Sequence, residues 1–161
     1  MTIDTIDPRE FRDALGCFAT GVAVATCRDA DGAAIGLTIN SFSSVSLDPP
    51  LVLWSLGRSS QHFDGFANAG HYAINVLREE QRDLSRRFSL PQEDRWLGID
   101  VDVWRTGAPI IPDCLATVEC TTEAIHDGGD HIILIGRVVR LASDRRGRPL
   151  LYFGGRYASL A

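Results

Sequence analysis

The sequence lacks the long apolar runs and basic segments that define several large protein classes. No stretch approaches the roughly 20 apolar residues of a membrane span, and residues 1–10 have neither the basic region nor the apolar run of a signal peptide. The formal net charge of -5 disfavours nucleic acid as the main partner, because phosphate binding needs a basic surface. These absences predict a cytoplasmic protein that binds neither nucleic acid nor a membrane.

Common catalytic and metal-binding signatures are also missing. The cysteines have no CxxC spacing and the histidines no HExxH spacing, so we expect no metal site formed by the protein alone. The cysteines lie in apolar segments, which predicts buried, reduced thiols at Cys17, Cys27, Cys114 and Cys120. The patterns GxSxG, GxxxxGKS and GxGxxG do not occur. A dinucleotide, if one binds, therefore binds without a Rossmann fold.

The chain length of 161 residues suits one domain covering residues 1–161. Asp7 as a cap, followed by Pro8 and Glu10, predicts a first helix that ends at residues 20–21. The other predicted helices lie around residues 63–66 and over residues 79–88, and the predicted strands are 22–27, 34–40, 51–56, 71–77, 114–125, 131–141 and 150–153.

These elements predict a mainly antiparallel sheet closed into a barrel, because most strands are joined by hairpins and closure removes exposed edges. Strand 51–56 is apolar throughout and is expected to be buried on both faces. Residues 89–108 form a long irregular segment, which we expect to cover a site.

Residues 34–40 alternate between aliphatic and polar side chains. Thr38 and Asn40 are expected to share one face with Gly36, and the serine-rich residues 41–46 follow directly. A flavin ring needs hydrogen bonds along one edge, which this strand and turn supply. A polar strand end that leads into an ordinary loop explains the same pattern, so both interpretations remain open. The residues expected on the core face are Ile35, Leu37 and Ile39.

Residues 57–62 place an arginine and two serines before a predicted helix. A helix N-terminus favours phosphate, and Arg58 adds a forked, charged donor. Ser59 or Ser60 as a simple helix cap is the alternative interpretation.

Two later segments suit contact with a nucleotide. His131 begins an otherwise apolar strand, which places it at the rim of the core, where a ligand or a purely structural contact is expected. Segment 152–157 combines aromatic rings with Arg156, which suits stacking on a dinucleotide; packing of a terminal strand against the barrel explains the aromatic residues equally.

Seven short motifs occur in a fixed order along nearly the whole chain, and together they resemble the flavin reductase family of the FMN-binding split-barrel superfamily. The match is weakest over residues 89–106. The matching segments, with x for positions outside the match, are FRxxLGxFATGVAV at 11–24, GLTxNSFSSVSxxPP at 36–50, NVL at 75–77, GAP at 107–109, EC at 119–120, GDHxxxxGRV at 129–138 and PLLYxxGxY at 149–157.

The resemblance implies a six-stranded antiparallel Greek-key split β-barrel with peripheral α-helices, assembled as a homodimer. It also implies three groups of site residues. The flavin ring and ribityl chain would contact Thr38, Asn40, Ser41, Ser43 and Ser44. The flavin phosphate and neighbouring cofactor atoms would contact Ser55, Leu56, Arg58, Ser59, Ser60, His62 and Phe88. The nicotinamide would contact His131, with Tyr152, Arg156 and Tyr157 nearby.

The function implied by the resemblance is hydride transfer from NADH or NADPH to FMN or FAD, with reduced flavin passed to a partner monooxygenase. No side chain is needed as a nucleophile or general base, because the ligands carry the chemistry. Three rivals remain open from the sequence: a flavin- or haem-binding module without turnover, a flavin oxidase of the same superfamily, and a structural dimer without a ligand.

Overall fold

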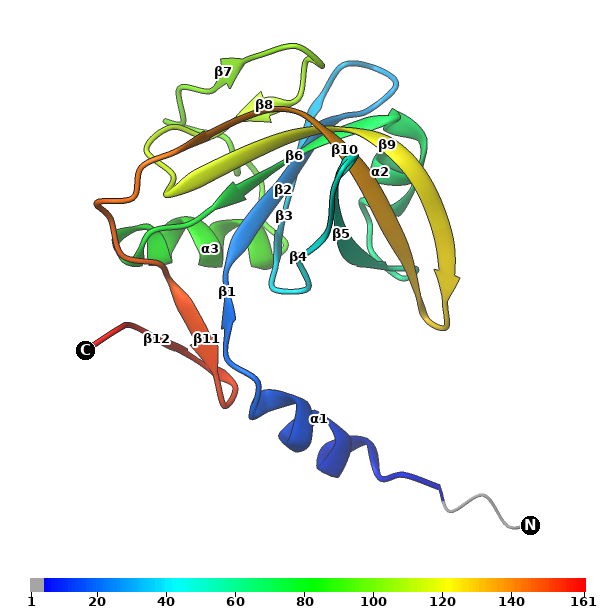
Figure 1. The fold of residues 1–161 in the computed structure, drawn as a ribbon, viewed down its shortest axis with the longest axis vertical. Helices are drawn as coiled ribbons and strands as arrows, with labels where there is room; N and C mark the ends of the chain where they lie inside the picture. Colours follow the sequence, from blue (N-terminus) through cyan, green and yellow to red (C-terminus); the bar gives the residue numbers. More distant parts are fainter. Residues whose placement is uncertain (1–4) are drawn as a thin grey trace.

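The computed structural model describes residues 5–161, so the expectations for residues 1–4 lie outside it. Its main feature is an antiparallel sheet of seven strands (Figure 1). Across the sheet the order is β3 (Ala34–Ile39), β2 (Ala23–Arg28), β6 (His71–Val76), β9 (Ala116–Gly128), β10 (His131–Ser143), β5 (Pro50–Gly57) and β4 (Ser43–Leu47). The mainly β character predicted from the sequence is confirmed.

The sheet is not closed, so the prediction of a closed barrel is wrong. The edge strands β3 and β4 follow each other in the chain, yet their pairing partners in the described residues are β2 and β5. A side chain crosses near this opening: the Ser41 hydroxyl accepts a hydrogen bond from Ser55 N at 3.0 Å and donates one to Ser55 O at 3.3 Å. Strand β4 was not predicted, because its serines give no apolar alternation.

The open sheet explains which residues of strand β5 are buried. Val52, Trp54 and Leu56 are buried, whereas the residues between them are only partly covered. The prediction that both faces of this strand are buried is therefore wrong. Since β5 lies next to the edge strand β4 in an open sheet, only one of its faces meets the core.

The first helix, α1 (Pro8–Gly16), begins as predicted: the Asp7 carboxylate accepts hydrogen bonds from Arg9 N at 2.8 Å and Glu10 N at 3.1 Å. It ends four residues before the predicted stop, and β1 (Thr20–Gly21) follows. The helix stands away from the sheet and buries none of its residues (Figure 1). Its apolar side chains Phe11 and Leu15 are therefore left more than half exposed.

The remaining helices lie on the sheet. They are α2 (Phe63–Ala69), the short 3₁₀ helix η1 (Glu79–Gln81) and α3 (Arg82–Ser89). The small strands form two further sheets: β1 with β11 (Leu151–Phe153) and β12 (Arg156–Ala158), and β7 (Asp102–Val103) with β8 (Pro109–Ile110). Within residues 5–161, no helix has the length and apolar character needed to cross a membrane.

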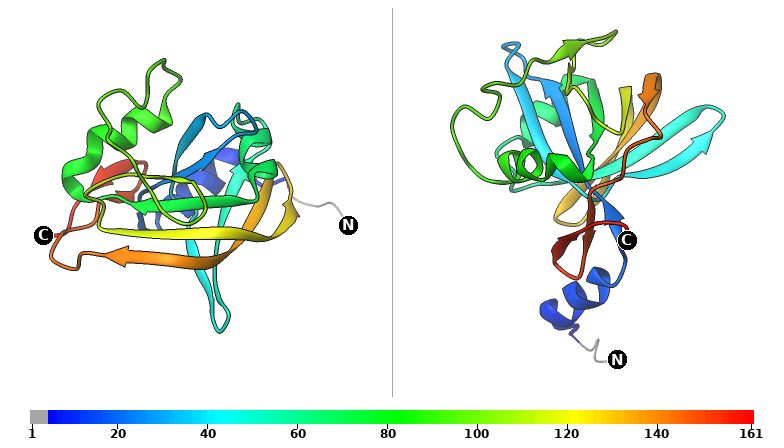
Figure 2. Two further views of the ribbon diagram at one scale, coloured as in Figure 1. Left: turned by 90° about the horizontal axis from the view of Figure 1, so that it is seen from above. Right: turned by 90° about the vertical axis from the view of Figure 1, so that its left-hand side faces the viewer.

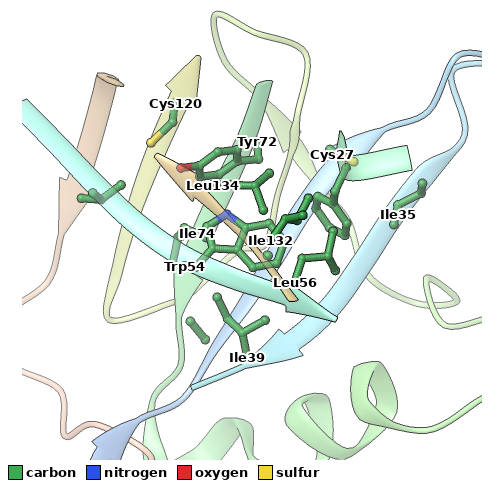
Figure 3. Packing of buried hydrophobic residues seen from close by; sticks show 14 residues of the cluster. Cys27, Ile35, Ile39, Trp54, Leu56, Tyr72, Ile74, Cys120, Ile132 and Leu134 are labelled. Atoms are coloured by element: carbon green, nitrogen blue, oxygen red, sulfur yellow. The ribbon is translucent and has the colours of Figure 1, made fainter. Parts of the chain in front are cut away.

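The main core is built around Trp54, which is fully buried (Figure 3). Its ring meets Phe66 and Tyr72 edge to face, with centroid distances of 5.0 and 5.7 Å. Cys27 and Cys120 belong to the same cluster, and burial raises the pKa of both thiols to about 12. Their predicted state as buried thiols is confirmed.

Candidate functional site

The most promising site is cavity 1, a space of about 630 Å³ between β3, α3 and the C-terminal pair β11–β12. This volume lies within the usual range of small-molecule sites, roughly 300–1,000 Å³. It brings together five of the predicted site residues, Thr38, Asn40, Tyr152, Arg156 and Tyr157. The other lining residues are Val22, Ile39, Arg82, Ser85, Arg86, Ser89, Leu90 and Gly155.

Hydrogen bonds fix the polar side of cavity 1. The Thr38 hydroxyl donates to the carbonyl of Ser85 at 2.6 Å, which joins β3 to α3. Because its proton is committed there, the Thr38 oxygen is left as an acceptor towards the cavity. The Ser85 hydroxyl lies 2.7 Å from the Tyr157 hydroxyl, which ties the C-terminal strand to the same helix. Asn40, at the end of β3, is exposed.

The opposite wall of cavity 1 is aromatic and cationic. The rings of Tyr152 and Tyr157 pack edge to face with centroids 5.7 Å apart. The guanidinium carbons of Arg82 and Arg86 lie 5.0 and 6.0 Å from the Tyr157 centroid. Together with Arg156, they give the lining three arginines and no carboxylate among the residues described. In a chain of net charge -5, this local positive charge favours an anionic ligand.

Sequence reasoning missed Arg82, Ser85 and Arg86. A usable signal was present, because Arg82 and Arg86 have the i, i+4 spacing that places two side chains on one helix face. What the sequence did not show was that this face lies against β3.

The structure places two predicted cofactor contacts in the core. Leu56 and Phe88 are fully buried, so their side chains offer no surface to a ligand in this conformation. Phe88 instead supports the site from behind: a Cβ at Gly36 would lie 2.5 Å from its ring, so glycine is required there. Ser41 and Ser55 bond to each other at the opening of the sheet, and Ser43 and Ser44 begin the edge strand β4.

His131 and Arg58 form a second group beside the β9–β10 turn. The His131 side chain is 48% exposed and its Nδ1 lies 2.7 Å from Asp130 Oδ1. The hydrogen bond and charge of His131 lower the pKa of Asp130. Arg58 is paired with Asp127 and donates to Gly129 O at 3.2 Å, so its charge is already partly neutralised.

This second group lies at the end of β5, because His131 is opposite Gly57 in the β10–β5 ladder. Neither His131 nor Arg58 is among the residues that line cavity 1.

His62 occupies a separate cavity. Ser60 accepts a hydrogen bond from His62 N at 3.2 Å, and the helix cap is His62 rather than Ser59 or Ser60. The His62 ring lines cavity 2, of about 660 Å³, together with the start of β3 and residues 92–97. The prediction that residues 89–108 cover a site is consistent with this placement.

Cys17, predicted to be buried, is exposed because α1 stands free of the core.

A cationic, tyrosine-walled cavity beside an open antiparallel sheet suits planar, anionic ligands of the nucleotide type. Residues 15–161 match the family model described as flavin reductase like domain. The chain belongs to this family.

Known relatives carry the same assignment. The chain is 41% identical over 160 residues to the reductase subunit HsaB of a flavin-dependent monooxygenase from Rhodococcus jostii, covering 99% of this chain and 82% of that protein. It is 48% identical over 149 residues to FMN reductase (NADH) SmoA from Agrobacterium fabrum, covering 92% of this chain and 84% of that protein. It spans only 44% of the length of a Rhizobium meliloti flavin reductase with 51% identity over 138 residues.

A solved structure supports the comparison at the level of the fold. The NADH:FAD oxidoreductase of Streptomyces globisporus, determined with NAD and FAD fragments, aligns with a TM-score of 0.90 and 32% identity. The alignment covers 98% of this chain and 97% of that one.

Proposed function

We propose that the chain is an NAD(P)H-dependent flavin reductase in which the flavin and nicotinamide rings meet in cavity 1. The observation that carries the proposal is the two-sided lining of this cavity. Thr38 and Asn40 on β3 offer hydrogen-bonding groups to a flavin edge, and Tyr157 with Arg82 and Arg86 offers an aromatic, cationic wall to a dinucleotide. Relatives named as FMN reductase and as NADH:FAD oxidoreductase support FMN or FAD and NADH as the ligands.

The ligands supply hydride transfer from the nicotinamide to the flavin, so the chain has to bind, orient and shield them. The Thr38 oxygen would accept a hydrogen bond from the flavin edge, because its own proton is held by Ser85 O. The Ser85–Tyr157 hydrogen bond joins α3 to β12, and the Thr38–Ser85 hydrogen bond joins β3 to α3, so both walls of cavity 1 are tied to the same helix. Two planar rings bound there would have to stack roughly 3–3.5 Å apart for hydride transfer.

A steady-state assay tests the function. The purified chain should oxidise NADH only when FMN, FAD or riboflavin is added, and the rate should saturate with free flavin. A protein that stays yellow after purification and is inert to NADH would be a flavin-binding module instead. NADH oxidation that is equally fast without added flavin would also contradict the proposal.

His131→Ala is expected to raise the KM for NADH several-fold and to change flavin binding little. His131 lies opposite Gly57 at the end of β5 and its side chain is 48% exposed, so we propose that the NADH molecule contacts it outside cavity 1. Kinetics with varied NADH and fluorescence titration with flavin measure the two effects separately. Unchanged NADH parameters would remove His131 from this role.

The partner and assembly belong to the same proposal. A relative that is the reductase subunit of a flavin-dependent monooxygenase supports delivery of reduced flavin to a monooxygenase. We place this delivery in the cytoplasm. A homodimer would cover the parts that project from the body of the fold (Figure 2), namely α1, with Phe11 and Leu15 exposed, and the β4–β5 hairpin, whose Leu47 is 96% exposed. We further propose that six strands of the main sheet have the Greek-key arrangement of a split barrel. Sedimentation that gives the mass of a monomer would refute the dimer.

A further inference from the structure

The aromatic, cationic wall of cavity 1 combines two elements, α3 and the β11–β12 pair, and Arg78 lies where both begin. Helix α3 starts four residues after Arg78, at Arg82, and supplies two arginines of the wall. The backbone of Arg78 forms a bridge with Pro149, two residues before β11, which supplies a tyrosine. Arg78 itself does not line the cavity.

The guanidinium of Arg78 joins two further segments of the chain. Its Nε donates to the carbonyl of Asp113 at 2.6 Å, and its Nη2 donates to Asp144 Oδ2 at 2.9 Å. Gly147 packs over the guanidinium, because a Cβ there would overlap Nη1. The Arg78 side chain is only 20% exposed, so these charge-assisted hydrogen bonds are partly shielded from water. Arg78 therefore clamps the connection after β10 to the segment before β9.

Backbone hydrogen bonds link this clamp to the tyrosines of the wall. Glu79 N donates to Arg148 O at 3.0 Å, and Leu150 N donates to Leu77 O at 3.0 Å. Leu150 and Leu77 belong to one buried apolar cluster, and the two tyrosines of the wall pack against that cluster. A shift of the connection 144–150 would therefore move the tyrosines relative to α3.

We propose that Arg78 is a positioning residue for the nicotinamide dinucleotide. It holds the connection 144–150 against η1, and so keeps the tyrosines of β11–β12 beside the arginines of α3. The inference rests on the proposed function, because it places the dinucleotide against this wall. Without the clamp, the wall is in its binding position for only part of the time, and the apparent affinity for NADH falls in proportion. The kcat changes little, because bound NADH selects the intact wall.

Steady-state kinetics and flavin titrations of Arg78→Gln test this role. The KM for NADH should rise roughly fivefold, which corresponds to a wall that is in place for about one fifth of the time. The kcat and the Kd for FMN should each change less than about twofold, because β3 is proposed to hold the flavin and belongs to the main sheet. An unchanged KM for NADH would overturn the proposal, and so would equal losses of NADH and flavin binding.

Arg146→Gln is the matched control. Arg146 donates to the same Asp144 carboxylate, at 2.9 and 3.3 Å, but its side chain is 91% exposed. This variant should leave the KM for NADH unchanged, and an equal rise in both variants would contradict the clamp. Arg78→Lys keeps the charge and should recover part of the NADH affinity; no recovery would also count against the proposal. Asp144→Asn keeps the bond from Arg78 to Asp113 O, so it should raise the KM less than Arg78→Gln does.

Hydrogen exchange tests the clamp without using the activity. In Arg78→Gln the amides of Glu79 and Leu150 should exchange faster, whereas those of β2 and β3 should keep the rates of the unmodified protein. Faster exchange throughout the sheet would indicate a general loss of stability and would contradict a local positioning role. An unmodified protein that fails to oxidise NADH with added flavin would refute the reductase function instead, and the exchange result does not depend on it.

Discussion

Tyr157→Ala should raise the KM for NADH by roughly tenfold. The substitution removes the ring that packs on Tyr152, the partner of Arg82 and Arg86, and the hydroxyl bonded to Ser85. Aromatic and cation–π contacts of this kind contribute about 0.5–2 kcal/mol, and 1.4 kcal/mol corresponds to a factor of ten in affinity. Steady-state kinetics at saturating flavin measure the effect.

Tyr157→Phe is the matched control because it keeps the ring and loses only the hydrogen bond to Ser85. It should change the KM for NADH by no more than about threefold, since one hydrogen bond contributes about 0.5–1.5 kcal/mol. The affinity for flavin should change little in either variant, because we propose that Thr38 and Asn40 hold the flavin from β3. A loss of flavin binding with unchanged NADH kinetics would reverse the assignment of the two sides of cavity 1.

The largest stability effect is expected at Glu119, a fully buried carboxylate on β9. It accepts hydrogen bonds from Arg105 N at 3.1 Å, Thr106 N at 2.6 Å and the Thr106 hydroxyl at 2.7 Å. Glu119→Ala leaves these donors without their acceptor and creates a cavity. The free energy of unfolding should fall by about 3–5 kcal/mol.

Urea denaturation measures this loss. Glu119→Gln keeps one acceptor oxygen and should give an intermediate value. Glu123→Gln is the surface control on the same strand, because Glu123 is paired with Arg137 outside the core, and it should change stability little. Equal losses for Glu119→Ala and Glu123→Gln would show that the buried acceptor has no special role.

Local signals in the sequence predicted most of the elements correctly. The Asp7 cap, the alternation along residues 34–40 and the β9–β10 hairpin all have short-range causes, so they could be predicted without the fold. The open sheet could not be predicted from local signals, because closure depends on whether the two edge strands, β3 and β4, meet. The serine-rich strand β4 was not predicted either, because an edge strand needs no apolar face and so shows no alternating apolar pattern.

At the site, too, short-range patterns could be predicted from the sequence and long-range contacts could not. The polar face of β3 was predicted from alternation, and Thr38 and Asn40 do line cavity 1. The arginines of α3 that line cavity 1 were missed, because their place in the lining depends on which strand the helix packs against. Arg58 was predicted as a phosphate ligand, but its pairing with Asp127 comes from a hairpin about 70 residues later in the chain. No pattern near Arg58 could have shown that contact.

A crystal structure with FMN and NAD bound would test the central claim most directly. The account predicts a flavin ring in cavity 1 with its edge hydrogen-bonded to the Thr38 oxygen, and a nicotinamide stacked on it from the Tyr157 side. Both rings bound elsewhere, or a cavity 1 filled by the protein's own side chains, would contradict it.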